Sequence, residues 1–189
     1  LAVDDHGAAL AAQLRVALSL PGNPPEAVAT LTDKLRFRQL QQSIGLPHPA
    51  FVGVEDDGVG VVGALAFPLV VKARQLNASR GVIRVDDVVQ YARAIRKVRT
   101  IQARAQRHAE TLGVLVERFI PGVEVALDGV LSDGVLQVLA VFDKPDPLDG
   151  PTFVETLFVT PSRLPAGIQR ELAAAVQRAC VAAGVEDGV

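Results

Sequence analysis

The chain has 189 residues, of which 49% are hydrophobic and 21% charged, and its formal net charge is −2. This composition is typical of a globular protein with enough residues to bury a core. The charge balance and the scarcity of aromatic residues (Tyr91 is the only tyrosine and tryptophan is absent) argue against a nucleic-acid partner. Because no apolar run approaches the length of a membrane span and no signal peptide is evident, we expect no membrane association. A single cysteine, Cys180, excludes a disulfide framework and favours a cytoplasmic setting.

Two features suggest that the sequence is part of a longer protein. The chain begins at Leu1 and contains no methionine. Its last residues, 184–189, follow a helical pattern and resemble the approach to a new strand. We therefore expect an excised piece.

Hydrophobic periodicity and the placement of glycine and proline predict the elements. In chain order they are a helix over 4–20, a proline-rich link over 21–25, a helix over 33–44, a strand over 51–54, a weak helix over 58–65, strands over 69–72 and 82–85, a helix over 86–112, strands over 114–117, 124–130, 135–142 and 153–159, and a helix over 165–183. Hairpins follow one another in the second half, which favours an α+β fold with two lobes. We expect a helical segment over 1–50, a small lobe over 51–117 and the start of a large lobe over 118–189, incomplete at its C-terminus.

Lys72 ends a short apolar run, and a loop of small residues follows it at 77–81. An ammonium group at a strand end, beside a loop whose backbone N–H groups face outward, can hold a polyphosphate. An ordinary strand-end lysine is the alternative. The chain takes most of its positive charge from arginine, and its only lysines are Lys34, Lys72, Lys97 and Lys144. Lysine is a compact point charge that arginine does not replace, although chance placement of any one lysine stays open. Lys97 falls within a helical pattern and is expected on the solvated surface.

Four motifs occur in a fixed order. They are Thr32-Asp33-Lys34-Leu35-Arg36, then Pro68 to Lys72 with the loop Ser79-Arg80-Gly81-Val82, then Leu115 to Glu124, and finally Phe142-Asp143-Lys144 followed by Phe153-Val154-Glu155 and Pro161 to Pro165. This order resembles the ATP-grasp superfamily, and within it the carboxylate–amine ligase branch that contains L-amino acid ligases and D-alanine–D-alanine ligases. The resemblance covers nearly the whole chain. It implies two lobes with a nucleotide cleft between them.

The resemblance also implies roles for individual residues. Lys34 would approach the nucleotide phosphates, and Lys72 would contact phosphate and the adenine side of the cleft. Ser79, Arg80 and Gly81 would belong to the loop that covers the phosphates. Glu117, with the backbone of Arg118 and Ile120, would contact the adenine edge, and Glu124 would hold the ribose hydroxyls. Lys144 would lie near the transferred phosphate and is the one catalytic candidate. The alternative for Lys34 is an ordinary first-turn helix residue. The alternatives for Glu117, Glu124 and Lys144 are surface ion pairs.

The chain departs from the family pattern in two places. Asn77 and Ala78 stand where the loops of relatives commonly carry glycine and serine, so the loop is expected to be less mobile or differently aimed. The Mg²⁺ ligands of the family lie on strands that would follow Val189, so no metal ligand is expected within this chain.

The function implied is that of an ADP-forming carboxylate–amine ligase that acts through an acylphosphate and uses ATP and Mg²⁺. Its substrates would be a small carboxylate and an amine, with amino acids as the expected class, and a homodimer is left open. The present piece would be the ATP-binding portion and inactive alone. The alternatives are a nucleotide-binding module without turnover, and a carboxylase or purine-pathway enzyme of the same superfamily.

Overall fold

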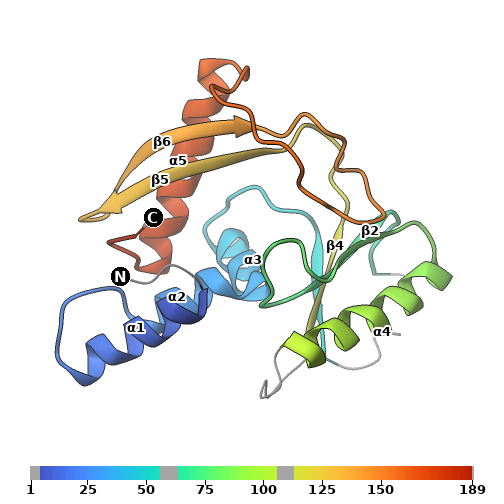
Figure 1. Ribbon diagram of the computed structural model, residues 1–189, viewed down its shortest axis with the longest axis horizontal. Coiled ribbons are helices and arrows are strands. Elements are labelled where there is room, and N and C mark those ends of the chain that lie inside the picture. Colours follow the sequence, from blue (N-terminus) through green and yellow to red (C-terminus); the bar gives the residue numbers. More distant parts are fainter. Residues whose placement is uncertain (1–4, 56–63, 106–112, 189) are drawn as a thin grey trace. The chain divides into compact units, whose positions relative to one another are not determined.

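The computed structural model describes residues 5–55, 64–105 and 113–188 (Figure 1). Its elements are α1 (Asp5–Ala17), α2 (Pro25–Thr32), α3 (Lys34–Ser43), β1 (Phe51–Val54), β2 (Leu69–Ala73), β3 (Val82–Val85), α4 (Val88–Ala105), β4 (Val114–Arg118), β5 (Val125–Ser132), β6 (Val135–Asp143) and α5 (Ala166–Ala183). The strands form one sheet in the order β1-β4-β2-β3 and a two-stranded sheet, β5-β6, and every neighbouring pair is antiparallel. Helices combined with antiparallel sheets confirm the predicted α+β class.

The chain divides into two compact units. The first unit comprises residues 1–47, 124–145 and 158–189, and the second comprises 48–123 and 146–157. Each unit therefore contains segments that are distant in the sequence. The domain boundaries expected at residues 50 and 117 stay predictions.

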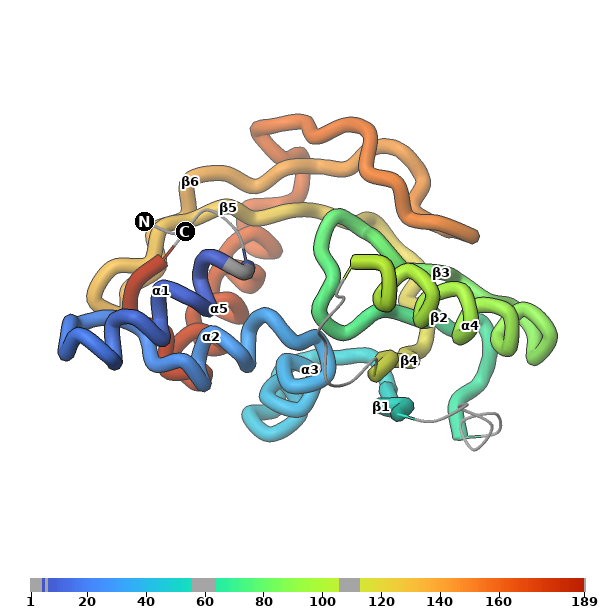
Figure 2. The backbone as a smooth tube through the Cα atoms, turned by 60° about the horizontal axis from the view of Figure 1, so that its bottom comes forward, coloured from blue at the N-terminus to red at the C-terminus, as the bar shows by residue number. Residues whose placement is uncertain are grey.

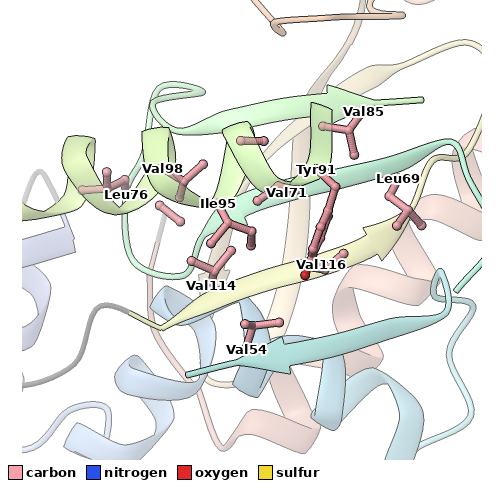
Figure 3. Close-up of a cluster of buried hydrophobic side chains, with 12 residues drawn as sticks. Val54, Leu69, Val71, Leu76, Val85, Tyr91, Ile95, Val98, Val114 and Val116 are labelled. Carbon is pink, nitrogen blue, oxygen red and sulfur yellow. The ribbon is translucent and has the colours of Figure 1, made fainter. Parts of the chain in front are cut away.

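The core of the second unit lies between its four-stranded sheet and α4 (Figure 3). Leu69, Val71, Val85, Val114 and Val116 from the strands meet Tyr91, Ala94, Ile95 and Val98 from the helix. Strand side chains alternate between the two faces of a sheet, so only one face of β2 and β4 contributes to this core. Figure 2 shows α4 running beside β2 and β3.

Helix α4 begins where the sequence predicts. The Asp87 carboxylate accepts hydrogen bonds from the backbone N–H groups of Val89 and Gln90, both at 2.8 Å, which caps the first turn. Val88 and Ala105, at the two ends of α4, are exposed. The expected continuation over 106–112 lies outside the described residues, as do positions 58–63 of the expected weak helix.

Residues 146–157 return to the free edge of β3 (Figure 1). Thr152 forms an isolated antiparallel bridge with Ile83, and the Arg84 backbone N–H donates to the Pro151 carbonyl at 3.0 Å. The strand predicted over 153–159 is wrong. Apart from the bridge between Val159 and Asp143, these residues make no ladder, and most of their side chains are exposed.

The first unit contains a helix that sequence reasoning missed. Residues 21–25 were expected to be a link, whereas Pro25 begins α2. Proline suits the first turn of a helix, because it has no N–H group to leave unsatisfied there. Asp33 separates α2 from α3 with extended backbone, and its carboxylate accepts from the N–H groups of Leu35 (2.9 Å) and Arg36 (3.3 Å). Asp33 therefore caps α3 from the position before it, whereas the sequence predicted a helix that includes Asp33.

The hairpin β5–β6 and helix α5 form the rest of the first unit. The predicted turn is present, with Asp133 and Gly134 both at positive φ (50° and 75°), as a two-residue hairpin requires. Gly184 ends α5 in the left-handed conformation, as predicted. Leu131, Ala27 and Val185 form a small apolar cluster that joins the hairpin to helices from both ends of the sequence. Within the described residues, no helix has the length and apolarity needed to cross a membrane.

The core of the second unit permits a matched test of burial. Val98 and Val89 both lie on α4, but Val98 is fully buried and Val89 is 56% exposed. Val98→Ala should lower the free energy of unfolding by about 2 kcal/mol more than Val89→Ala, because helix propensity changes equally in both. Urea unfolding of the two variants measures the difference. Equal effects would show that the packing of α4 on the sheet is not as described.

Candidate functional site

Lys72 on β2 forms an ion pair with Glu117 on β4. In the register of these antiparallel strands Val70 lies opposite Glu117, so Lys72, two residues further on, is its diagonal neighbour on the same face. The Lys72 side chain is 19% exposed and that of Glu117 only 6%. The structure thus joins two residues that the family resemblance places near the adenine side of the nucleotide, with Lys72 also expected at the phosphates.

This pair lies on the sheet face that α4 does not cover. Val71, between Val70 and Lys72, points into the core beneath α4, and Val116 does the same beside Glu117. Because neighbouring residues of a strand alternate, Lys72 and Glu117 must point to the opposite face. Both faces of the two central strands are therefore buried. One carries the apolar core beneath α4, and the other carries the ion pair together with the buried side chains of Val70 and Leu115.

The backbone N–H group of Arg118, at the end of β4, is not available for the adenine contact expected there. The Arg118 backbone N–H donates to the Ala50 carbonyl at 2.9 Å, so it is already engaged within the second unit. Arg118 would have to contact a ligand through its carbonyl or its exposed side chain. Ile120, two residues beyond, is 64% exposed. The adenine contact assigned to these residues stays a prediction.

The loop between β2 and β3 is held by its own contacts. Arg80 donates from Nη2 to the Asn77 side-chain oxygen at 2.7 Å and from Nε to the Asn77 carbonyl at 3.3 Å. Ala78 and Ser79 adopt positive φ (51° and 54°), which glycine would adopt without strain. Gly81 also has positive φ, and a Cβ there would lie 3.3 Å from that of Ala73. Asn77 therefore ties the loop to Arg80, and the expected loss of mobility stays a prediction.

A pocket of about 420 Å³ lies against this loop within the second unit. It is bounded by residues 78–83, by Lys97 and Ile101 of α4, and by residues 152–155. Three predicted site residues, Ser79, Arg80 and Gly81, are among its walls. Lys97 is exposed, as expected, but its position in this pocket was missed. Lys97 and Ile101 are four residues apart and therefore lie on one face of α4. This spacing was the sequence signal that could have indicated the pocket.

In the first unit, Lys144 and Glu124 come together. Lys144 Nζ lies 2.6 Å from a Glu124 carboxylate oxygen and 5.3 Å from the centre of the Phe158 ring. The Lys144 side chain is 9% exposed and that of Glu124 49%. The two residues lie at the adjoining ends of β6 and β5, which brings a predicted phosphate contact beside a predicted ribose contact.

Lys34 is the first residue of α3, directly after the Asp33 cap. It belongs to the first unit, together with Glu124 and Lys144, whereas Lys72 and the loop belong to the second. Lys34 is half-buried. It lies on a helix whose first residue is determined by the Asp33 cap. The capping role of Asp33 and a ligand role of Lys34 are compatible.

Asp143, next to Lys144, anchors the segment after β6. Its carboxylate accepts hydrogen bonds from the Ser162 hydroxyl (2.5 Å), the Arg163 backbone N–H (3.0 Å) and Arg163 Nε (3.2 Å). The Ser162 hydrogen bond first, and then those from Arg163, hold the pKa of Asp143 below its ordinary value. Sequence analysis noted these segments as part of one motif but did not predict their contact. Asp143 therefore positions the chain around Lys144.

The described residues include no group of three or more histidine, cysteine, aspartate or glutamate side chains arranged to hold a metal ion. Burial raises the pKa of the Cys180 thiol, which disfavours the reactive thiolate and agrees with a packing role.

The ion pair between Lys72 and Glu117 predicts a strong coupling. Lys72→Met alone and Glu117→Leu alone should each lower the free energy of unfolding by about 3 kcal/mol, because each leaves a buried charge without its partner. The double variant should recover most of that loss, as urea unfolding can measure.

The exposed pair between Arg36 and Glu26, at 2.7 Å, is the matched control. The corresponding changes, Arg36→Met and Glu26→Leu, should each cost less than about 1 kcal/mol. Simple additivity at Lys72 and Glu117 would contradict the described burial of this pair.

Comparisons with known proteins identify the family of the chain. Residues 65–189 match the sequence model of the ATP-grasp domain family, which is more than half of the chain. The chain is 35% identical over 199 residues to carnosine synthase 1 of Gallus gallus, a match that covers 98% of this chain and 21% of that protein. It is 31% identical over 169 residues to D-alanine–D-alanine ligase of Pseudomonas entomophila (strain L48), covering 85% of this chain and 49% of that protein. The chain thus spans less than half the length of these relatives.

Solved structures give the same result. The L-amino acid ligase from Bacillus licheniformis superposes with a TM-score of 0.82 at 27% identity, over 100% of this chain and 42% of that one. The VanG D-Ala:D-Ser ligase from Enterococcus faecalis has a TM-score of 0.73 at 21% identity, over 92% of this chain and 52% of that one, a likeness that shows the fold alone. The resemblance inferred from the four motifs is confirmed: the chain belongs to the ATP-grasp domain family.

Proposed function

We propose that the protein containing this chain is an ADP-forming ligase that joins a small carboxylate to an amine, and that this chain is its ATP-binding portion. The observation that carries the proposal is the similarity of the whole chain, in fold and in sequence, to an L-amino acid ligase. Carnosine synthase and D-alanine–D-alanine ligase, the named relatives, are also ligases, which favours amino acids as substrates. A cytoplasmic setting and a homodimer stay predictions.

The chemistry of the polar side chains fits a nucleotide. Lys72 and the loop of Ser79, Arg80 and Gly81 would hold phosphates through one ammonium group, one guanidinium group and backbone donors. Glu124, whose carboxylate is half-exposed, would accept hydrogen bonds from the ribose diol. Lys34 and Lys144 would add positive charge at the phosphates, and Glu117, Arg118 and Ile120 would meet the adenine, as the family resemblance implies.

The proposed reaction uses ATP because a free carboxylate has no good leaving group. A carboxylate oxygen attacks the γ-phosphorus, the bond to the β-phosphate oxygen breaks, and ADP leaves. The amine nitrogen then attacks the acylphosphate carbonyl carbon, the carbon–oxygen bond to phosphate breaks, and the amine loses a proton. The phosphate therefore departs with an oxygen that came from the carboxylate.

Within this scheme Lys144 is the proposed catalytic residue. The Lys144 side chain is 9% exposed, and its ammonium group contacts Glu124 and the Phe158 ring, so its position is restrained before any ligand binds. A preorganised cation stabilises negative charge that builds up on a transferring phosphoryl group. Mg²⁺ would accompany ATP and neutralise part of that charge, but no residue of this chain is assigned to it.

A nucleotide-binding module without turnover is the second candidate. The observation in its favour is the loop, since Arg80 is bound to Asn77 by two hydrogen bonds and Ala78 occupies a position that suits glycine. The other alternative is a carboxylase or a purine-pathway enzyme of the same superfamily. Analysis of the reaction products would distinguish such an enzyme from an amino-acid ligase.

Oxygen labelling tests the reaction in the full-length protein. With an amino acid labelled with ¹⁸O in its carboxylate, the label should appear in inorganic phosphate in proportion to amide formed, because the carboxylate oxygen bridges to phosphorus. Mass spectrometry of the phosphate measures the transfer, and ADP is the expected nucleotide product. Label in AMP would refute the acylphosphate route, and ATP binding without turnover on any amine would favour the module.

Nucleotide binding tests the site in this chain. Glu124→Ala should weaken ADP binding by about tenfold or more in calorimetry, because it removes a charged acceptor. Glu26→Ala is the matched control, since Glu26 is also an exposed carboxylate in an ion pair and lies outside the proposed site. Lys72→Ala should weaken binding as well. Unchanged affinity in both the Glu124 and Lys72 variants would count against the site while leaving the family assignment intact.

A further inference from the structure

We propose that the pocket beside the β2–β3 loop binds a small carboxylate that carries an apolar group, at a site separate from the proposed nucleotide site. The pocket, about 420 Å³, falls in the range of about 300–1,000 Å³ that is usual for small-molecule sites. Its walls come from residues 78–83, from α4 and from residues 152–155, all within the second unit. The proposal does not rest on the proposed ligase function.

Positive charge dominates the polar part of the pocket. Lys97 and Arg80 are the two cations in its walls, and Glu155 is the one carboxylate. Within the described part of the chain, Lys97 makes no hydrogen bond or ion pair, and Arg80 bonds Asn77 through Nε and Nη2 only. The excess of one positive charge favours a monoanion, and Lys97, which has no part in the proposed nucleotide site, would be its principal donor.

The remaining walls are largely apolar. Ile101 lies one helical turn beyond Lys97 on α4, so a charged group and a hydrocarbon surface stand side by side. Phe153 and Val154 add further apolar side chains to the walls. The Phe153 ring contacts that of Phe119, at 6.4 Å between ring centres, and Val154 is 66% exposed. A triphosphate would leave this surface uncovered, whereas a carboxylate with a branched hydrocarbon group would cover it.

The pocket lies toward α4, away from the ion pair of Lys72 and Glu117. Lys97 and Ile101 belong to the helix that covers one face of the sheet, and the ion pair is on the other face. The loop is the shared wall, since Ser79, Arg80 and Gly81 line the pocket and are also predicted to cover phosphates. A bound carboxylate would therefore restrain the loop, which couples the pocket to whatever binds on the loop's other side.

Three related probes test the chemistry. They are 4-methylpentanoate, which has the carboxylate and the branched hydrocarbon, 3-methylbutylamine, which has an ammonium group instead, and L-leucine, which has both. Titration of the ¹⁵N-labelled chain with 4-methylpentanoate should shift amide signals of residues 78–83, 97, 101 and 152–155, with a Kd in about the millimolar range for so small a molecule. The amine should bind at least about tenfold more weakly.

The response of L-leucine identifies the source of the carboxylate. Binding of L-leucine as well as the acid would support the proposal with amino acids as ligands, and binding of the acid alone would support it with simple carboxylic acids. Equal binding of the acid and the amine would overturn the charge assignment, and shifts confined to other residues would overturn the site.

Variants on α4 complete the test. Lys97→Gln should weaken 4-methylpentanoate about fivefold to tenfold, and Ile101→Ala should weaken it by a similar factor. Arg96→Gln is the matched control, since Arg96 is an exposed cation next to Lys97 that does not line the pocket, and it should leave the Kd unchanged. Equal Kd values for the Lys97 and Arg96 variants would refute the proposal, and so would complete loss of the probe's shifts on saturation with ADP.

Discussion

The alternation of side chains along β2 and β4 is the constraint on which the rest of the structure depends. On one face Val71 and Val116 pack beneath α4, and on the other Lys72 and Glu117 form a largely buried ion pair. A slip of one residue in the register would exchange these two sets and bring the charged pair into the apolar core beneath α4. The hydrophobic core therefore determines where the lysine and glutamate point, and stability and ligand binding share two strands.

Residues 146–157 are the second feature on which the structure of the second unit depends. They contribute no strand, yet Arg84 holds them through its backbone N–H on Pro151 and its guanidinium on the Asp149 carbonyl at 2.7 Å. The Arg84 guanidinium also lies 4.4 Å from the centre of the Phe119 ring, next to Phe153. One arginine thus joins β3, the end of β4 and a segment from much later in the sequence. Without this contact the pocket beside the loop would lose one wall.

Charged pairs recur where predicted site residues occur. Lys72 is held by Glu117, and Lys144 is held by Glu124, each between neighbouring strands. A lysine side chain has several rotatable bonds, and ordering it on ligand binding costs conformational entropy. Pairing with a carboxylate restrains the ammonium group in advance. A ligand phosphate must then share or displace the glutamate, which makes the electrostatics of both pairs central to affinity.

The sequence by itself determined the class of fold, most of the strands and helices, and the family, because periodicity, helix caps such as Asp87 and turn residues such as Gly134 act locally. It also marked Lys72, Glu117, Glu124 and Lys144 as site candidates through their order along the chain. It did not show that these four form two ion pairs, since pairing depends on strand register. It missed α2, which begins at a proline, and it placed a strand over 153–159, where the described residues are mostly exposed and form only one isolated bridge, between Val159 and Asp143. The sequence also did not reveal the pocket that contains Lys97, because the walls of this pocket come from three separate segments that only tertiary packing brings together.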